Sequence, residues 1–402
     1  MLHKKEVITR REFLTAIGGA AMVLSLSEFS NAQPVKRIIG RDMLVYVGTY
    51  TSGESKSEGI YIYKLKTESG ALTPYKIVKN VEEPSFLAIG KSRKYLYAVN
   101  ETLEHEGKKS GAVSAFAIDQ KTGDLEFLNK QASRGGAPCH ISVSDNGKFV
   151  LVANYVGGNA ASFPIQKDGS LGVSIDVEQH SGSGPNKERQ EAAHAHSIIL
   201  DAKNRFVFVN DLGIDRVMIY KFDASSGILQ PNRAQPFYQT KPGAGPRHFS
   251  LHPNGRFAFL INELDSTISS LANDAEKGSL KEIQTLSTLP AGFSGVNSCA
   301  DLHLSPNGAL LYGSNRGHDS IVSYKIDFRT GRLELIEHVP TQGKTPRNFA
   351  IDPTGTFLLA ANQGSDSIVT FRIDTKTGKL NPTGNKANVP APVCLKLIPS
   401  FA

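Results

Sequence analysis

One short phrase, a glycine followed by any residue and a leucine, returns seven times and constrains the fold more than any other feature. Each copy follows a run of alternating apolar residues, and successive glycines lie 46 to 58 residues apart. This period is typical of four-stranded propeller blades and too long for most helical repeats. The chain therefore predicts seven blades, with the phrase at Gly70-Ala71-Leu72, Gly123-Asp124-Leu125, Gly169-Ser170-Leu171, Gly227-Ile228-Leu229, Gly278-Ser279-Leu280, Gly331-Arg332-Leu333 and Gly378-Lys379-Leu380.

The rest of each repeat reads as β structure. Residues 59–65, 319–326 and 366–373 alternate with a period of two, as strands packed between sheets do. Further upstream lies a hairpin such as 249–262, whose Asn254-Gly255 step supplies the positive backbone angles of a tight turn. No run keeps a helical period, so the fold class is all-β.

The two ends of the repeat region complete each other. Residues 393–399 resemble only the first strand of a hairpin, and residues 44–50 resemble only the second. We therefore expect the N- and C-terminal strands to pair, closing a seven-bladed β-propeller of four-stranded antiparallel blades over residues 43–402. Closure removes the exposed strand edges that promote aggregation. An open sandwich, the alternative, gives no reason for seven similar units.

The first 32 residues differ from the repeats. Thr9-Arg10-Arg11-Glu12-Phe13-Leu14 precedes a mild apolar stretch, 16–26, and the segment ends in Ser30-Asn31-Ala32. This pattern predicts a twin-arginine export signal at 1–32, followed by a short linker at 33–42. The apolar stretch is too short for a good membrane span. We expect an exported protein, periplasmic or extracellular, without stable membrane insertion after cleavage; an uncleaved anchor is the alternative.

Charge and motifs exclude several classes of function. The formal net charge is +7 without any basic block, so nucleic acid is not an expected partner, whereas a small anionic substrate is. No Gly-x-Ser-x-Gly, phosphate loop, zincin helix or dinucleotide fingerprint occurs, and no cofactor is expected. We expect a monomer. Cys139, Cys299 and Cys394 are odd in number, which favours small buried residues over a disulfide.

Superimposing the repeats reveals two columns that vary in polar character. At the start of the first strand the column reads Ser85, Cys139, His196, Arg247, Ala300, Arg347 and Val393. After the end of the second strand it reads Tyr50, Glu101, Tyr155, Leu212, Glu263, Arg316 and Gln363. Positions that carry the same residue type in every repeat indicate a structural role. The two columns that differ between repeats are therefore the candidates for a functional role.

The geometry of a hairpin brings the two columns together. In an antiparallel hairpin the start of one strand lies opposite the end of the next, so Arg247 should lie beside Glu263, and Arg316 opposite Ala300. With the first strand innermost, these residues and His196 collect at one mouth of the central channel. A carboxylate or imidazole can activate water there, and guanidiniums can hold an oxyanion or an anionic substituent. The alternative is a purely structural Arg247–Glu263 ion pair.

Other residues are candidates for substrate binding. His194 lies two positions before His196; the pair lacks a third ligand at convincing spacing, so no metal site is expected. His248 and Asp301 follow the first column by one residue, and Glu101 belongs to the second. The polar segment 180–191 lengthens one repeat just before His194 and predicts a flap over the mouth that offers Lys187 or Arg189.

The same motifs resemble a known family. Gly245-Pro246-Arg247-His248, Asn262-Glu263-Leu264, Ala300-Asp301-Leu302-His303 with Ser314-Asn315-Arg316, and His194-Ala195-His196-Ser197 are similar to the seven-bladed lactonases, which include bacterial 6-phosphogluconolactonase and the fungal carboxymuconate lactonising enzyme. The likeness runs from about residue 43 to 398. It implies metal-independent chemistry on a lactone, with His196, Arg247, Glu263 and Arg316 as the active group.

Three hypotheses follow. In the first, the protein hydrolyses a sugar-derived lactone: Glu263 or His196 activates water, and Arg247 with Arg316 stabilises the oxyanion or binds an acidic substituent. The export signal favours a lactone other than the cytosolic phosphogluconolactone. In the second, the same arginines serve a muconate-type lactonising cycloisomerase. In the third, the propeller is a non-catalytic binding module.

Overall fold

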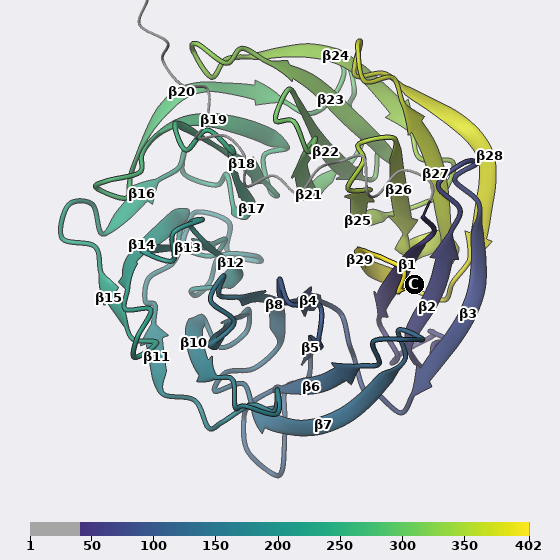
Figure 1. The fold of residues 1–402 in the computed structure, drawn as a ribbon. Coiled ribbons are helices and arrows are strands. Elements are labelled where there is room, and N and C mark those ends of the chain that lie inside the picture. Colours follow the sequence, from purple (N-terminus) through teal and green to yellow (C-terminus); the bar gives the residue numbers. More distant parts are fainter. Residues whose placement is uncertain (1–40, 402) are drawn as a thin grey trace, which may run out of the picture. The chain divides into compact units, whose positions relative to one another are not determined.

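The structure is a computed structural model that describes residues 41–401. The predicted export signal and all but two residues of the predicted linker lie outside the described residues. Within 41–401, strands form seven sheets arranged around a central axis (Figure 1), and the one helical element is a 3-10 turn, η2 (Gln363–Ser365). None of the helical structure in this part of the chain has the length and apolar character needed to cross a bilayer.

Each blade is an antiparallel sheet that follows the chain from the axis outward. Counting from the innermost strand, the first three complete blades in chain order are β4 (Leu87–Ile89), β5 (Tyr95–Asn100), β6 (Ala112–Ile118) and β7 (Leu125–Ala132); β8 (Pro138–Val143), β9 (Phe149–Asn154), β10 (Asn159–Pro164) and β11 (Asp176–Gln179); and β12 (Ala195–Leu200), β13 (Phe206–Asp211), β14 (Arg216–Phe222) and β15 (Leu229–Pro231), with β16 (Phe237–Gln239) also on β14.

The next three blades repeat this order. They comprise β17 (Pro246–Leu251), β18 (Phe257–Asn262), β19 (Thr267–Asp274) and β20 (Ser279–Ser287); β21 (Ser298–Leu304), β22 (Leu310–Arg316), β23 (Ser320–Ile326) and β24 (Leu333–Pro340); and β25 (Pro346–Ile351), β26 (Phe357–Asn362), β27 (Ser367–Ile373) and β28 (Leu380–Asn388).

The seventh blade joins the two ends of the propeller. Its strand order is β29 (Pro392–Pro399), β1 (Met43–Thr49), β2 (Gly59–Leu65) and β3 (Leu72–Lys79). β1 and β29 pair antiparallel from Met43 opposite Pro399 to Val47 opposite Leu395, and Figure 1 shows the purple and yellow strands side by side. The predicted seven-bladed propeller and its closure by the terminal strands are confirmed.

The repeated glycine phrase has a defined role in packing one blade on the next. All seven glycines have a positive φ, between 63° and 89°, which favours glycine over any residue with a side chain. Gly331, for example, lies against the ring of Phe257 in the preceding blade, and a Cβ at that glycine would come within 2.5 Å of the ring. Tyr312 reinforces another such junction by donating a hydrogen bond to the carbonyl of Gly378 over 3.1 Å. The phrase therefore marks the joints between blades.

The innermost strands carry a second repeated device. In six of the blades within 41–401 the pairing of the two innermost strands slips at a β-bulge near the start of the innermost strand. The bulges lie between Pro138 and His140, Ala195 and Ser197, Pro246 and His248, Cys299 and Leu302, Pro346 and Asn348, and Pro392 and Cys394. A bulge turns the extra residue's side chain away from the regular alternation. The residues of the first variable column, among them His196, Arg247 and Arg347, occupy these bulges.

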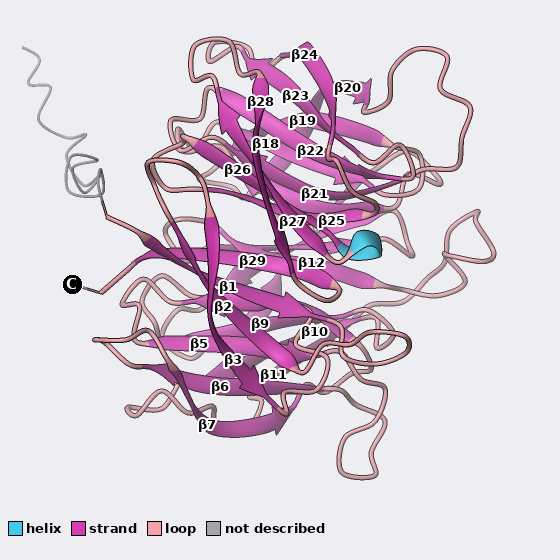
Figure 2. Ribbon diagram, turned by 90° about the vertical axis from the view of Figure 1, so that its right-hand side faces the viewer, coloured by secondary structure: helices cyan, strands magenta, loops and turns pink. Residues whose placement is uncertain are grey.

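The ring has two different ends. In Figure 2 η2 and the beginnings of the innermost strands lie toward the right-hand side, and β29 runs back to the C-terminus at the left. We call the right-hand end, where the innermost strands begin, the mouth, and the other end the turn side, because the hairpin turns such as Asn254-Gly255 lie there.

We predict that Gly331→Ala weakens the joint between two blades. The new methyl group meets both a positive φ and the buried ring of Phe257, so the free energy of unfolding should fall by about 2–5 kcal/mol. Gly107→Ala is the matched control, because Gly107 has φ 72° against 74° at Gly331 and no atom within 4 Å of the added Cβ. Urea unfolding of both variants measures the difference; equal losses would mean that the joint tolerates a side chain.

Candidate active site

Glu263 is the centre of the charged cluster at the mouth. It follows β18 directly, and its side chain is buried among three arginines. Oε2 accepts from Arg247 Nε at 2.8 Å and lies 3.0 Å from Arg316 Nη2, and Oε1 accepts from Arg189 Nη2 at 2.7 Å. The pairing of Arg247 with Glu263 expected from the hairpin is present, and Arg316 and Arg189 join it from two other segments.

Electrostatics keep this carboxylate ionised. Burial alone would raise the pKa of Glu263, but the charges of Arg316, Arg247 and Arg189 outweigh burial and lower the pKa to about 2. Both oxygens are already engaged by guanidinium groups. A carboxylate of this kind is a weak base, so its clearest chemical role is to fix the arginines in place.

His196 approaches the same carboxylate from the neighbouring blade. Its Nε2 lies 3.8 Å from Glu263 Oε2, and its Nδ1 lies 3.8 Å from the thiol sulfur of Cys139. Burial, followed by the positive charge of Arg247, lowers the pKa of His196 well below the usual value. The imidazole is therefore neutral at pH 7, and no close hydrogen bond occupies either ring nitrogen.

The long loop before β12 reaches over the mouth, where the sequence predicts a flap. Arg189 connects this loop to the mouth, because its Nη2 donates hydrogen bonds to Glu263 and, over 3.3 Å, to the hydroxyl of Tyr155. The next residue, Gln190, is fully buried and donates to the carbonyl of Leu212 at 2.8 Å, which anchors the loop. Lys187 is exposed, and its Nζ donates a hydrogen bond to the carbonyl of Gly184 in the same loop over 3.4 Å.

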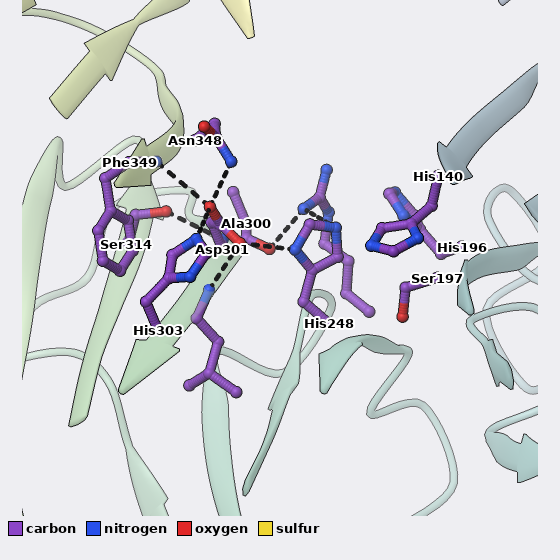
Figure 3. Close-up of polar contacts among 12 residues, drawn as sticks. His140, His196, Ser197, His248, Ala300, Asp301, His303, Ser314, Asn348 and Phe349 are labelled. Carbon is purple, nitrogen blue, oxygen red and sulfur yellow. Dashed lines mark hydrogen bonds and ion pairs between the residues drawn. The ribbon is translucent and has the colours of Figure 1, made fainter. Parts of the chain in front are cut away.

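His248 and Asp301 line the turn-side cavity, and Figure 3 shows His248 between Asp301 and His196. The two pair through His248 Nδ1 and Asp301 Oδ1 at 2.7 Å, and Arg247 Nη1 lies 3.2 Å from His248 Nε2. Burial, with the charge of Arg247, lowers the pKa of His248 to about 4. Asp301 also bonds His303 at 2.8 Å and the amide of Asn348. These contacts support Arg247 from below.

Glu101 lies on the opposite wall of the mouth. It accepts hydrogen bonds from the hydroxyls of Tyr50, at 3.1 Å, and Ser85. Arg347 stands beside this wall with its guanidinium carbon 5.3 Å from the centre of the Tyr50 ring. Arg347 and Tyr50 belong to the two variable columns, but the sequence assigned them no role, although Arg347 is a second arginine in the first column.

His194 is engaged at the rim. Its ring stacks on Tyr155 with centres 4.5 Å apart, and its nitrogens lie 3.0 Å from Glu191 Oε1 and 3.0 Å from the carbonyl oxygen of Tyr155. Within residues 41–401, no group of three or more His, Cys, Asp and Glu side chains is placed to hold a metal ion. Cys139, Cys299 and Cys394 are buried and free, as expected for small interior residues.

Two cavities occupy the axis of the propeller. The mouth cavity has a volume of about 10 Å³, room for about one water, and is lined by Tyr50, Ser85, Phe86, Glu101, Cys139, His196, Arg247, His248, Arg347 and Val393. The turn-side cavity measures about 600 Å³ and is lined by residues that include His140, Asp301, His303 and Lys396. Phe86 and His248 line both cavities, so they form the partition between them. The mouth cavity is too small to hold a lactone in this arrangement of side chains.

A closed seven-bladed propeller with arginines, a carboxylate and a neutral imidazole at one mouth has the groups needed by an enzyme that acts on cyclic esters. The family model for lactonases with a seven-bladed β-propeller matches residues 44–397. The chain belongs to this family, and the predicted enzyme class, a lactonase, is confirmed.

Individual relatives agree with the family. The chain is 38% identical to the 6-phosphogluconolactonase of Bacillus subtilis over 353 residues, which cover 88% of this chain and 97% of the relative. It is also 38% identical to the 6-phosphogluconolactonase of Formosa agariphila, over 77% of this chain and 86% of the relative. Among solved structures, the periplasmic gluconolactonase of Pseudomonas aeruginosa is 32% identical, with a TM-score of 0.83 and coverage of 89% of this chain and 99% of that one.

We predict that Glu263→Gln costs stability as well as activity. Removing the carboxylate leaves buried guanidiniums without their counter-charge, so the free energy of unfolding at pH 7 should fall by about 3–5 kcal/mol. Because the pKa of Glu263 falls from 4.5 to about 2 on folding, its ionised form stabilises the protein above pH 4.5, and this contribution disappears as the pH drops through 2. The gap between wild type and variant should therefore narrow by about 3 kcal/mol between pH 4.5 and 2.

Urea unfolding across this pH range measures both effects. Glu276→Gln is the control, because its side chain is 75% exposed and its ion pair with Arg205 lies on the surface. That change should leave the free energy of unfolding nearly unchanged at every pH, because water and salt screen an exposed ion pair. A loss below 1 kcal/mol for Glu263→Gln at pH 7 would contradict the central role given to this carboxylate.

Proposed function

We propose that the protein hydrolyses a sugar-derived lactone at the mouth, and that His196 is the general base. The choice of base rests on one observation, the difference in pKa and hydrogen-bond partners between Glu263 and His196. Glu263 has a pKa of about 2 and guanidinium partners on both oxygens, whereas His196 is neutral and has no close hydrogen bond. Only a neutral nitrogen with a free lone pair can accept a proton from water without first breaking other contacts.

The reaction then uses the cluster as follows. With Arg189 swung away, the lactone carbonyl lies above the mouth cavity, and His196 takes a proton from the attacking water. Glu263 lies 3.8 Å from His196 Nε2, so its negative charge stabilises the imidazolium that forms. The proton then passes from the imidazolium to the ring oxygen as the carbon–oxygen bond breaks, leaving an open hydroxy acid.

Arg247 is the donor best placed for the oxyanion. Its Nε bonds Glu263 and its Nη1 bonds the carbonyl of Ala300, which fixes the plane of the guanidinium. Its Nη2 makes no recorded hydrogen bond with residues 41–401, and Arg247 lines the mouth cavity. Arg316, which also bonds the carbonyl of Cys299 at 2.8 Å, acts mainly by holding Glu263. Such fixed donors are worth about 3–4 kcal/mol in acyl transfer.

His248 and Asp301 receive positioning roles in this proposal. Their paired side chains support Arg247 from the turn side, and Asp301 faces the turn-side cavity instead of the mouth cavity. His194 orients Tyr155, which in turn contacts Arg189. Glu101 remains a predicted contact to substrate because it lines the mouth cavity, and Arg189, once it has left Glu263, is the predicted contact from the loop.

Export is part of the proposal. The twin-arginine pattern at 10–14 supports a location outside the cytoplasm, and one similar solved structure carries the description periplasmic gluconolactonase. Fractionation of the native host, with the Arg10→Lys, Arg11→Lys double variant as the control, tests this location.

A panel of phosphorylated and plain aldonolactones, followed by proton release, tests the reaction itself. We expect wild type to open at least one of them and His196→Gln to lower kcat by about 100- to 10,000-fold, since an amide of similar size cannot accept the proton. His252→Gln, at a hairpin turn on the turn side, is the control and should keep full activity. Full activity of His196→Gln would remove His196 from the mechanism, and closure of a muconate without lactone hydrolysis would identify a cycloisomerase.

The pH profile gives a separate prediction. Because the pKa of His196 lies well below 6.5, the base stays neutral throughout the range from pH 6.5 to 8. We expect kcat/KM, corrected for spontaneous hydrolysis, to be flat over that range and to fall only at more acidic pH. An acid limb with its midpoint at 6.5 or higher would be inconsistent with this assignment.

A further inference from the structure

Arg347 is the arginine of the mouth that lacks a partner. Arg189, Arg247 and Arg316 all bond Glu263, and each has a second recorded acceptor or contact. Arg347, by contrast, makes no hydrogen bond or ion pair with any residue in 41–401, and its guanidinium lies over the ring of Tyr50, 5.3 Å from the ring centre. A guanidinium carries five N–H donors, so this side chain holds unused donors at the site.

The position of Arg347 makes these donors significant. It occupies the bulge at the start of β25 and lines the mouth cavity together with His196 and Arg247. The residue is partly buried, where an unpaired cation is costly unless an anion joins it. Tyr50, Glu101 and Glu263 are close enough for their charges to raise the pKa of Arg347 against the opposing effect of burial, so it remains cationic.

Glu101 supplies the complementary group on the same wall. Its Oε2 is held by Tyr50 and Ser85, whereas its Oε1 has no recorded partner within the described residues. The wall opposite Glu263 therefore presents a planar cationic donor beside a carboxylate acceptor. An anionic substituent matches the first, and a ring hydroxyl matches the second.

We propose that Arg347 binds an anionic substituent of the substrate, a phosphate or a carboxylate, while Glu101 accepts a hydrogen bond from a neighbouring hydroxyl. The preferred substrate is then an acidic sugar lactone. This inference rests on the proposed lactone hydrolysis, and it separates the two walls of the mouth: the Glu263 wall performs the chemistry and the Arg347 wall recognises the substrate.

The test compares three lactones on wild type, Arg347→Gln and Arg347→Lys. They are 6-phosphoglucono-δ-lactone, a glucarolactone that carries a free carboxylate, and plain glucono-δ-lactone. For the preferred acidic lactone, Arg347→Gln should raise KM by about 10- to 100-fold with little change in kcat, the effect of losing a charge-assisted contact. The KM of Arg347→Lys should lie between those of wild type and Arg347→Gln, because lysine keeps the positive charge but loses the paired N–H donors of the guanidinium. For glucono-δ-lactone, kcat/KM should change less than about threefold.

The control variant is Arg93→Gln, which removes the same charge from an exposed turn and should alter none of these constants. Thermal unfolding checks that each variant is folded. A comparable loss on acidic and plain lactones would overturn the proposal, because it would make Arg347 structural or catalytic. So would an unchanged KM for both acidic lactones, or wild-type preference for the plain one.

Calorimetry with 6-phosphogluconate and with glucarate separates this proposal from the hydrolysis on which it rests. Binding of either acid that weakens at least tenfold in Arg347→Gln, without turnover of any lactone, would retain the anion subsite and reject lactone hydrolysis. Turnover of plain lactone without binding of either acid would retain hydrolysis and reject the subsite.

Discussion

The joint between neighbouring blades is the contact on which the rest of the structure depends. At each joint a glycine with a positive φ lets the outer turn of one blade lie directly against a large side chain of the blade before it, as Gly331 does with Phe257. These joints matter because each blade of a propeller contacts mainly its two neighbours. Closure through β1 and β29 then fixes where every innermost strand begins, and the mouth inherits its geometry from that ring.

The mouth gathers more positive charge than a small buried site usually tolerates. Burying cations is costly unless they are paired, and Glu263 solves this by bonding Arg189, Arg247 and Arg316 at once. The arginines lower the pKa of the carboxylate to about 2, whereas burial, followed by the charge of Arg247, lowers the pKa of His196 and keeps it neutral. Burial and charge therefore give Glu263 and His196 different protonation behaviour. The sequence alone cannot show which of the two is the better base.

The sequence predicts the fold and the membership of the cluster because both depend on repetition. Seven copies of the glycine phrase give the blades, and antiparallel pairing places Arg247 beside Glu263 without knowledge of side-chain conformation. The sequence does not predict where the charged end of a long side chain lies in the folded protein. The reach of Arg189 from its loop to Glu263, and the isolation of Arg347, depend on rotamers and burial. The bulges at the innermost strands were equally hidden, since they change the pairing without changing the pattern of residue types.

The partition formed by Phe86 and His248 divides the axial tunnel into two compartments that do not serve as a continuous passage. If the lactone binds at the mouth, as we propose, the mouth is both the entrance for the lactone and the exit for the hydroxy acid. The loop that carries Arg189 contacts Glu263 at this end, so its opening would control substrate entry and product release together.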